Sequence, residues 1–103
     1  MERKYKIKIY PLAQQDMDEI FNYISNELNN PLAAIKLIND FEKAFEITLL
    51  FPMSWSLINN EYAKDQSLRK IIVNNYIAFY RIKDDEIQIV RVLYAMSNYQ
   101  ELL

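Results

Sequence analysis

Two pairs of turn-forming residues, Asn74-Asn75 and Asp84-Asp85, divide a run of β-prone side chains that extends from residue 68 to residue 94. Two-residue breaks of this kind are typical of tight β-hairpin turns. The spacing therefore predicts a three-stranded antiparallel meander, in which residue 73 pairs with residue 76 and residue 83 pairs with residue 86. The predicted strands are residues 68–73, 76–82 and 86–94.

The turns must form without glycine, because the chain contains none. Positive φ angles are sterically costly for most other residues, and Asn and Asp tolerate them best. Pairs of asparagine stand where the pattern requires a turn, at positions 29–30, 59–60 and 74–75. We expect such residues to supply the positive φ angles of this fold.

Residues 4–10 alternate between lysine and apolar side chains, and this alternation predicts a half-buried strand. Pro11 is suited to the first turn of a following helix. The helix extends to about residue 28, and its apolar residues recur at helical spacing. The predicted buried face comprises Ala13, Met17, Ile20, Phe21, Ile24 and Leu28.

Asn29-Asn30-Pro31 ends this helix and begins a second, which extends to about residue 50 before Pro52. Two helices joined by so short a turn are expected to form an antiparallel hairpin. Residues 53–67 are the least patterned, and we interpret them as a loop that could include a short strand at 55–58. The last residues, SNYQELL, could form one helical turn.

The predicted register assigns the side chains of the meander to two faces. We expect the helices to cover the face that is richer in isoleucine. That face comprises Arg69, Ile71, Val73, Tyr76, Ala78, Tyr80, Ile82, Ile87, Ile89, Arg91 and Leu93. The opposite face comprises Lys70, Ile72, Ile77, Phe79, Arg81, Gln88, Val90, Val92 and Tyr94.

Two helices can cover only one face of the sheet. We therefore expect the opposite face to be an exposed apolar patch, and such patches mark partner sites. The alternative is that the loop 53–67 folds across it. A one-residue slip in register would exchange the two faces. The residues expected to bind a partner or target are Lys70, Ile77, Phe79, Arg81, Val90, Val92 and Tyr94.

Composition excludes several classes of function. The 103 residues predict a single domain, residues 1–103, and they include no cysteine and no histidine. We therefore expect no metal site, no cofactor and no thiol or imidazole catalysis. The charged N-terminal segment and the lack of a long apolar run predict a cytoplasmic protein without a membrane anchor. A net charge of −2 argues against strong direct DNA binding.

The order of these elements, together with several short motifs, resembles the RelE/ParE superfamily of toxins from type II toxin–antitoxin systems. The resemblance covers nearly the whole chain. It implies an α+β two-layer fold, β-α-α-β-β-β, with a helix hairpin packed on an antiparallel sheet that includes the N-terminal strand. The matching segments are YPLAQQDMDEI, NNPLAAIKLI, Pro52, Leu68-Arg69, Tyr76, Phe79-Tyr80-Arg81 and Arg91-Val92-Leu93.

The resemblance also implies two activities. RelE-type members cleave mRNA on the ribosome with a basic cluster, whereas ParE-type members poison DNA gyrase. Of the RelE-type set, Lys70 matches a lysine of the first meander strand and Tyr99 matches the tail tyrosine. Other members of that set are replaced here by Leu68, Ile77 and Met96 or Ser97. This replacement favours a ParE-like gyrase poison that a cognate antitoxin neutralises.

Two alternatives remain. The first is a ribosome-dependent mRNA endonuclease with Lys70, Arg69 and Tyr99 as candidate catalytic residues. The second is a nontoxic module that only binds the antitoxin. Arginines could also have structural roles: Arg81 could pair with Asp84, Asp85 or Glu86, Arg69 with acids at the sheet margin, and Arg91 with Asp16 or Glu19.

Overall fold

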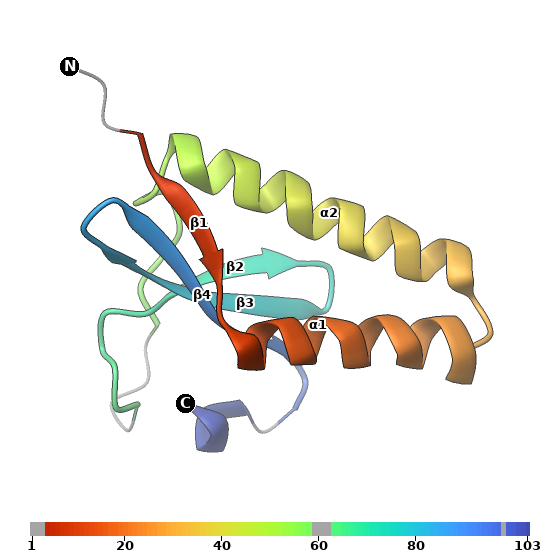
Figure 1. The fold of residues 1–103 in the computed structure, drawn as a ribbon. Helices are drawn as coiled ribbons and strands as arrows, with labels where there is room; N and C mark the ends of the chain where they lie inside the picture. Colours follow the sequence, from red (N-terminus) through yellow and green to blue (C-terminus); the bar gives the residue numbers. More distant parts are fainter. Residues whose placement is uncertain (1–3, 59–62, 98) are drawn as a thin grey trace.

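The computed structural model describes residues 4–58, 63–97 and 99–103, which form an α+β fold as predicted (Figure 1). The asparagine pair at 59–60 lies outside these residues. The strands are β1 (Lys6–Ile9), β2 (Arg69–Val73), β3 (Tyr76–Lys83) and β4 (Glu86–Tyr94). The helices are α1 (Pro11–Asn22), the π-helix η1 (Tyr23–Glu27), α2 (Pro31–Leu50) and the 3₁₀ turn η2 (Tyr99–Leu102). No helix in the described part of the chain is long and apolar enough to cross a membrane.

The four strands form one sheet in the order β1-β4-β3-β2. The meander has the predicted register at its turns, since Val73 pairs with Tyr76 and Lys83 pairs with Glu86. β1, however, runs parallel to β4, so the sheet is mixed and not purely antiparallel. No tight turn joins these two strands, and the path of the chain through the helix hairpin sets their relative direction.

Asparagine and aspartate supply the positive φ angles, as expected for a chain without glycine. The φ angle is 50° at Asn29, 53° at Asn74 and 57° at Asp84. Asn74 and Asp84 are the first residues of the two hairpin turns. The helix hairpin uses an asparagine pair in two ways, because Asn29 turns the chain and the Asn30 side chain caps α2 by accepting a hydrogen bond from the Ala33 N–H at 3.2 Å.

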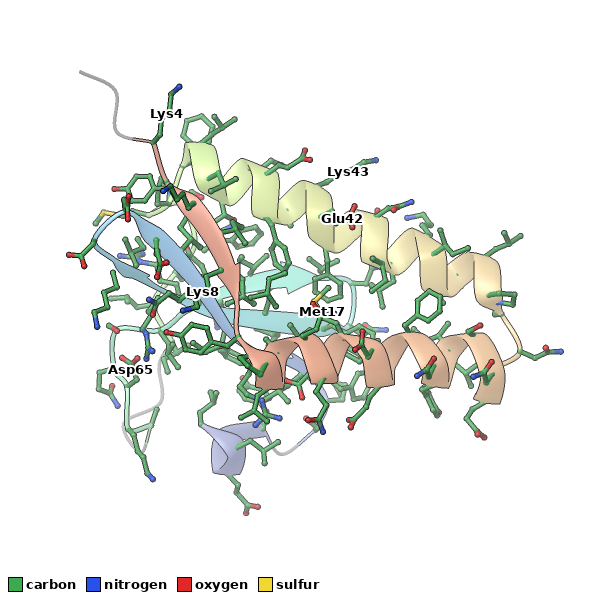
Figure 2. The ribbon with its side chains drawn as sticks, in the orientation of Figure 1. Lys4, Lys8, Met17, Glu42, Lys43 and Asp65 are labelled. Carbon is green, nitrogen blue, oxygen red and sulfur yellow. The ribbon has the colours of Figure 1, made fainter. Side chains whose placement is uncertain are left out.

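Both helices pack on one face of the sheet and form the second layer of the fold (Figure 1). Met17 extends from α1 into the space beside α2 (Figure 2). The isoleucine-rich sheet face is the one that the helices cover, as predicted. The buried core residues on this side include Ala13, Met17, Ala34, Leu37, Phe41, Phe45, Ile71, Val73, Ala78, Tyr80, Ile87, Ile89 and Val92.

The prediction for the end of the first helix was wrong at Leu28, which is exposed although Ile24 is buried. The reason is the π-helix η1, in which the chain makes wider turns than in an α-helix. The wider turns rotate the residues that follow, so Leu28 leaves the buried face.

The segment that follows α2 forms hydrogen bonds with both the sheet and the helical layer. The Tyr80 hydroxyl donates a hydrogen bond to the Pro52 carbonyl at 2.6 Å, and the Trp55 indole Nε1 donates one to Thr48 Oγ1 at 3.1 Å. Leu57 then forms an isolated antiparallel bridge with Arg69. The predicted short strand at 55–58 is therefore reduced to one bridge beside β2.

Candidate functional site

The sheet face opposite the helices is not the exposed patch that the sequence favours. Ile77 and Phe79 are 6% and 0% exposed, and with Leu93 they form a second buried cluster. Ile58 of the loop and Val90 of β4 pack against this cluster, as do three residues that follow the meander: Ala95, Tyr99 and Leu103. The alternative of a covering loop is thus correct, and the C-terminal residues complete the cover.

A β-bulge corrects the predicted face of the last strand. Tyr80 pairs with Ile89 but Phe79 pairs with Arg91, so Val90 is an extra residue in β4. An extra residue moves every later side chain to the other face of the sheet. Val92, predicted on the opposite face, therefore lies in the core beneath the helices. Leu93, predicted beneath the helices, lies on the opposite face.

Arg81 forms an ion pair on this opposite face, although its partner is not one of the hairpin acids that the sequence suggests. Its guanidinium pairs with Asp65 of the loop at 3.0 Å and donates hydrogen bonds to Gln88 Oε1 at 2.7 Å and to the Tyr10 hydroxyl at 3.2 Å. Figure 2 places Asp65 beside the sheet. Burial alone would raise the pKa of Asp65, but hydrogen bonds from Ser67 and Arg81 outweigh it and hold the pKa below its usual value.

The three candidate catalytic residues do not form one cluster of free polar groups. Arg69 donates hydrogen bonds to the carbonyls of Trp55 at 2.6 Å and Met53 at 3.4 Å, and it makes no ion pair within the described residues. The Tyr99 ring packs on Phe79, with 5.4 Å between the ring centroids. Lys70 has no ion pair in the described part of the chain.

Arg91 is bound to Asp16 of α1, which confirms one of the two partners predicted for it. Nε and Nη2 of Arg91 donate to the two carboxylate oxygens of Asp16 at 2.8 and 2.9 Å. The same carboxylate accepts the Val92 backbone N–H at 2.9 Å. The hydrogen bond to Asp16 raises the pKa of Arg91. This three-bond arrangement fixes α1 against β4 directly after the bulge.

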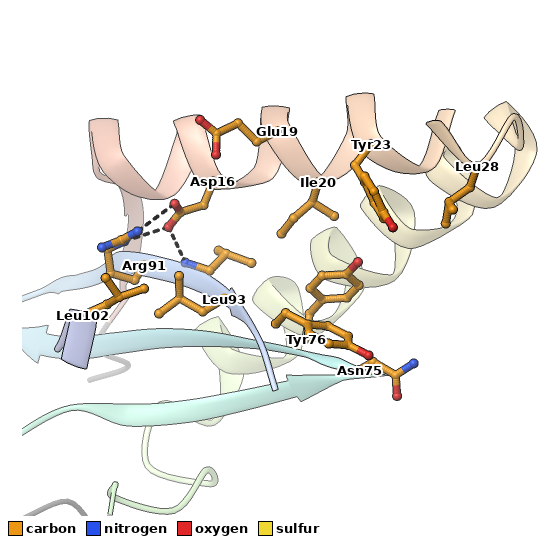
Figure 3. A pocket seen from close by; sticks show the side chains of 12 residues that line it. Asp16, Glu19, Ile20, Tyr23, Leu28, Asn75, Tyr76, Arg91, Leu93 and Leu102 are labelled. Carbon is orange, nitrogen blue, oxygen red and sulfur yellow. Dashed lines mark hydrogen bonds and ion pairs between the residues drawn. The ribbon is translucent and has the colours of Figure 1, made fainter. Parts of the chain in front are cut away.

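Beside this ion pair lies an open groove of about 730 Å³, which the sequence does not predict (Figure 3). One wall is α1 with η1, the other is the end of β4 with the β2–β3 turn, and Leu102 of η2 lies at one end. Ile20 and Tyr23 point from the helix toward Tyr76 on the sheet (Figure 3). The residues that line the groove are Asp16, Glu19, Ile20, Tyr23, Leu28, Asn75, Tyr76, Arg91, Val92, Leu93, Tyr94 and Leu102.

The groove combines exposed apolar side chains from segments that are distant in sequence. Tyr23, Leu28, Tyr94 and Leu102 are between 45% and 55% exposed. The Tyr94 ring packs against that of Tyr76 in a tilted arrangement, with 5.5 Å between the ring centroids and an interplanar angle of 59°. The sequence signal that could have indicated the groove is Tyr23, a large aromatic residue outside the predicted buried stripe of its helix.

The helical segment that forms one wall of the groove carries no basic residue. Residues 9–35 contain four carboxylates and no lysine or arginine. Two of these carboxylates, Asp16 and Glu19, line the groove. Asp16 is neutralised by Arg91, whereas Glu19 is exposed and makes no ion pair within the described residues. The groove is therefore a largely apolar, aromatic surface, and Glu19 is the one carboxylate of its lining that has no ion pair among the described residues.

Comparisons with known proteins agree with this fold. The family model for "ParE toxin of type II toxin-antitoxin system, parDE" matches residues 7–99. The chromosomal ParDE system from P. aeruginosa is similar in structure, with a TM-score of 0.72 and 20% identity over 90% of this chain and 98% of that chain. The RelBE2 toxin–antitoxin complex from Mycobacterium tuberculosis is also similar in structure, with a TM-score of 0.60 and 19% identity over 88% of this chain and 98% of that chain. No curated protein matches the chain significantly.

Proposed function

The chain belongs to the ParE toxin family of type II toxin–antitoxin systems, and we propose that it inhibits DNA gyrase and is neutralised by a cognate antitoxin. The family match, which spans residues 7–99, is the observation that carries this proposal. The two solved relatives are a toxin–antitoxin system and a toxin–antitoxin complex, which supports an antitoxin as the partner of this chain.

The condition of the candidate catalytic residues supports a target other than mRNA. Cleavage by attack of a ribose hydroxyl requires groups that accept a proton, stabilise the charged phosphorane and protonate the leaving oxygen. Arg69 and Arg81 are held by loop carbonyls and by Asp65, and the Tyr99 ring packs on Phe79. Of Arg69, Lys70 and Arg81, only Lys70 could contact a phosphate without breaking a described side-chain hydrogen bond or ion pair. One ammonium group supplies only one of the three roles.

The test is to induce the chain alone in bacteria and to follow incorporation of labelled thymidine and labelled methionine over the first minutes. We expect DNA synthesis to stop first. In parallel, the purified chain is added to gyrase with relaxed plasmid, where we expect loss of supercoiling or accumulation of cleaved DNA. Addition of the antitoxin encoded beside the chain should reverse both effects.

Each contrary result identifies a different function. Arrest of translation before DNA synthesis, with ribosome-dependent mRNA cleavage in vitro, would replace the gyrase proposal with the endonuclease. If neither process stops while the antitoxin still binds, the chain is a nontoxic antitoxin-binding module. If the chain stops DNA synthesis in cells but does not affect purified gyrase, the target is another replication protein.

A further inference from the structure

We infer that the outer face of α2 is a self-association surface, on which two copies of the chain pack their α2 helices side by side in opposite directions. The inference goes beyond the proposed function, because it depends on neither gyrase nor an antitoxin. Its starting point is a set of four large apolar side chains of α2, Leu32, Ile35, Ile47 and Leu50, which are between 49% and 78% exposed. One exposed leucine is ordinary, whereas four on one helix favour a partner.

The exposed side chains follow one face of the helix. Positions 32, 35, 39, 43, 46 and 50 are separated by steps of three or four residues, which places them along one side of an α-helix, and all six are exposed. The other side of α2 is buried against the rest of the fold. The helix lies at the margin of the molecule, with the sheet and α1 on one side of it (Figure 1), and Lys43 points away from the sheet (Figure 2).

The order of the residues on this face selects a second copy of the chain as the partner. Leu32 and Leu50 each lie nine residues from position 41, and Ile35 and Ile47 each lie six residues from it. In a twofold-symmetric pair, if one residue contacts a second residue of the other copy, the reverse contact also forms. When two such helices pack antiparallel about position 41, Leu32 and Ile35 of each copy meet Leu50 and Ile47 of the other.

The charges of the face are complementary in the same register. Lys36 and Glu46 each lie five residues from position 41, so Lys36 of one copy faces Glu46 of the other at two symmetric places. Lys36 pairs with Asp40 of its own helix at 2.8 Å, and its side chain is 74% exposed and long enough to reach a second carboxylate. The exposed charges of α2, Lys36, Lys43, Glu42 and Glu46, balance. The two faces therefore do not repel each other, although the chain has a net charge of −2.

The size of the face predicts a weak dimer. The 20 residues of α2 extend over about 30 Å, and contact along a single helix buries less than the roughly 800 Å² per partner of a stable complex. We expect a dissociation constant of about 10–100 μM. The groove beside Asp16 and Arg91 is lined by residues outside α2, so this pairing does not use it.

The experiment measures the mass of the purified chain by analytical ultracentrifugation at about 5 to 500 μM, a range that brackets the expected dissociation constant. The apolar variant combines Leu32→Ala with Leu50→Ala. The charge variants are Lys36→Glu and Glu46→Lys, each alone and both together. The matched controls lie on α1 and are Leu12→Ala, where the side chain is 54% exposed, and Glu19→Lys.

We expect the unmodified chain to change from monomer to dimer as its concentration rises. The apolar variant should weaken the dimer by about 10-fold or more, because it removes the apolar contacts at both ends of the interface. Each single charge variant should weaken it by about threefold or more at low salt and less at high salt, because like charges then face each other twice. The controls should change the dissociation constant by less than about twofold.

The charge variants also test the antiparallel register. The chain with both charge substitutions restores each Lys–Glu pair in reverse and should recover the dimer. An equimolar mixture of the two single charge variants should form a mixed dimer more readily than either variant pairs with itself. Because the mixed dimer requires both variants to be folded, it excludes misfolding as the cause of a loss, and circular dichroism and thermal unfolding verify the fold of every variant.

Several results would overturn the inference. One is a chain that stays monomeric over the whole range or that forms assemblies larger than a dimer. Another is a dimer that tolerates all of the α2 variants or is weakened as much by the α1 controls, since association would then use a different surface. Charge variants that lose the dimer without recovery in the double variant or in the mixture would contradict the antiparallel register. Each of these results leaves the gyrase proposal unaffected.

Discussion

Asp16 and Arg91 lie 75 positions apart in the sequence and form a two-point ion pair at 2.8 and 2.9 Å, and the same carboxylate accepts the Val92 N–H. One side chain of α1 thus satisfies both the charge of an arginine in the last strand and a backbone N–H of that strand beyond Ile89, where the described pairing with β1 ends. Breaking such a pair is more costly than its net contribution suggests, because the remaining charge loses its compensation.

Asp16→Asn should therefore lower the free energy of unfolding by about 1–3 kcal/mol. The amide can still accept one hydrogen bond but no longer balances the charge of Arg91. Asp18→Asn is the control, because Asp18 is exposed and accepts a hydrogen bond only from Gln14 of the same helix among the described contacts. Urea denaturation measures both. Equal stability of the two variants would contradict a structural role for the pair.

Phe79→Ala tests whether the second sheet face is covered. The side chain is 0% exposed beneath Tyr99, so the substitution should cost about 3–5 kcal/mol. Ile72 of β2 lies on the same face of the sheet but is about half exposed. Ile72→Ala should therefore cost about 1 kcal/mol or less. Chemical denaturation gives both values. Similar small losses for Phe79 and Ile72 would mean that the face is open in solution.

Asn29 has a positive φ, and its replacement tests the use of asparagine in place of glycine. Asn29→Ala should destabilise the protein by about 1–2 kcal/mol, because a Cβ without a polar group is disfavoured in the left-handed region. Asn29→Gly should be close to neutral. Asn22→Ala, in the exposed part of α1, should instead stabilise by up to about 0.7 kcal/mol. A loss at position 22 similar to that at position 29 would contradict the backbone explanation.

The alkaline stability should depend on Tyr76. Burial raises the pKa of Tyr76 above its ordinary value of 10.0. A raised pKa in the folded state gives stability that is complete below pH 10 and is lost as the pH rises through the folded value. When the pH is raised from below 10 to above 10, the free energy of unfolding should therefore fall less for Tyr76→Phe than for the unmodified chain. Unfolding measured at both pH values gives the two decreases. An identical decline in the two proteins would rule out this contribution.

Tyr80→Phe provides a contrasting case. Burial also raises the pKa of Tyr80, and its hydroxyl donates a hydrogen bond to the Pro52 carbonyl. This variant should lose about 0.5–1.5 kcal/mol at neutral pH as well, because a partner of the hydrogen bond is removed. Tyr76 has no such bond among those described, so its variant should show mainly the alkaline effect.

Lys70→Ala distinguishes the gyrase proposal from the alternative of an mRNA endonuclease. If gyrase is the target, growth inhibition should remain, because the lysine is not required for a phosphoryl reaction. Lys83→Ala is the control, an exposed lysine near the β3–β4 turn. Viable counts after induction give the result. If Lys70→Ala folds stably but is no longer toxic, while Lys83→Ala remains toxic, the mRNA endonuclease is supported.

Local patterns were sufficient for the order of the elements and for their turns. The two-residue breaks set the hairpin register at Val73–Tyr76 and Lys83–Glu86, since such turns admit few pairings. The need for positive φ without glycine identified asparagine and aspartate correctly at three turns. Each of these features depends on residues that are close in sequence, so the pattern contains the necessary information.

Features that depend on distant segments were decided by the tertiary structure. The extra residue Val90 in β4 exchanged the faces of the residues after it, and no local pattern reveals a bulge within an apolar strand. The parallel direction of β1, the cover over Phe79 and the Asp65 partner of Arg81 all depend on the paths of long connections. The groove is likewise a tertiary feature, because its walls come from segments that meet only when the chain has folded. The sequence by itself determined the elements and their order, and packing among distant segments decided which surfaces remained free.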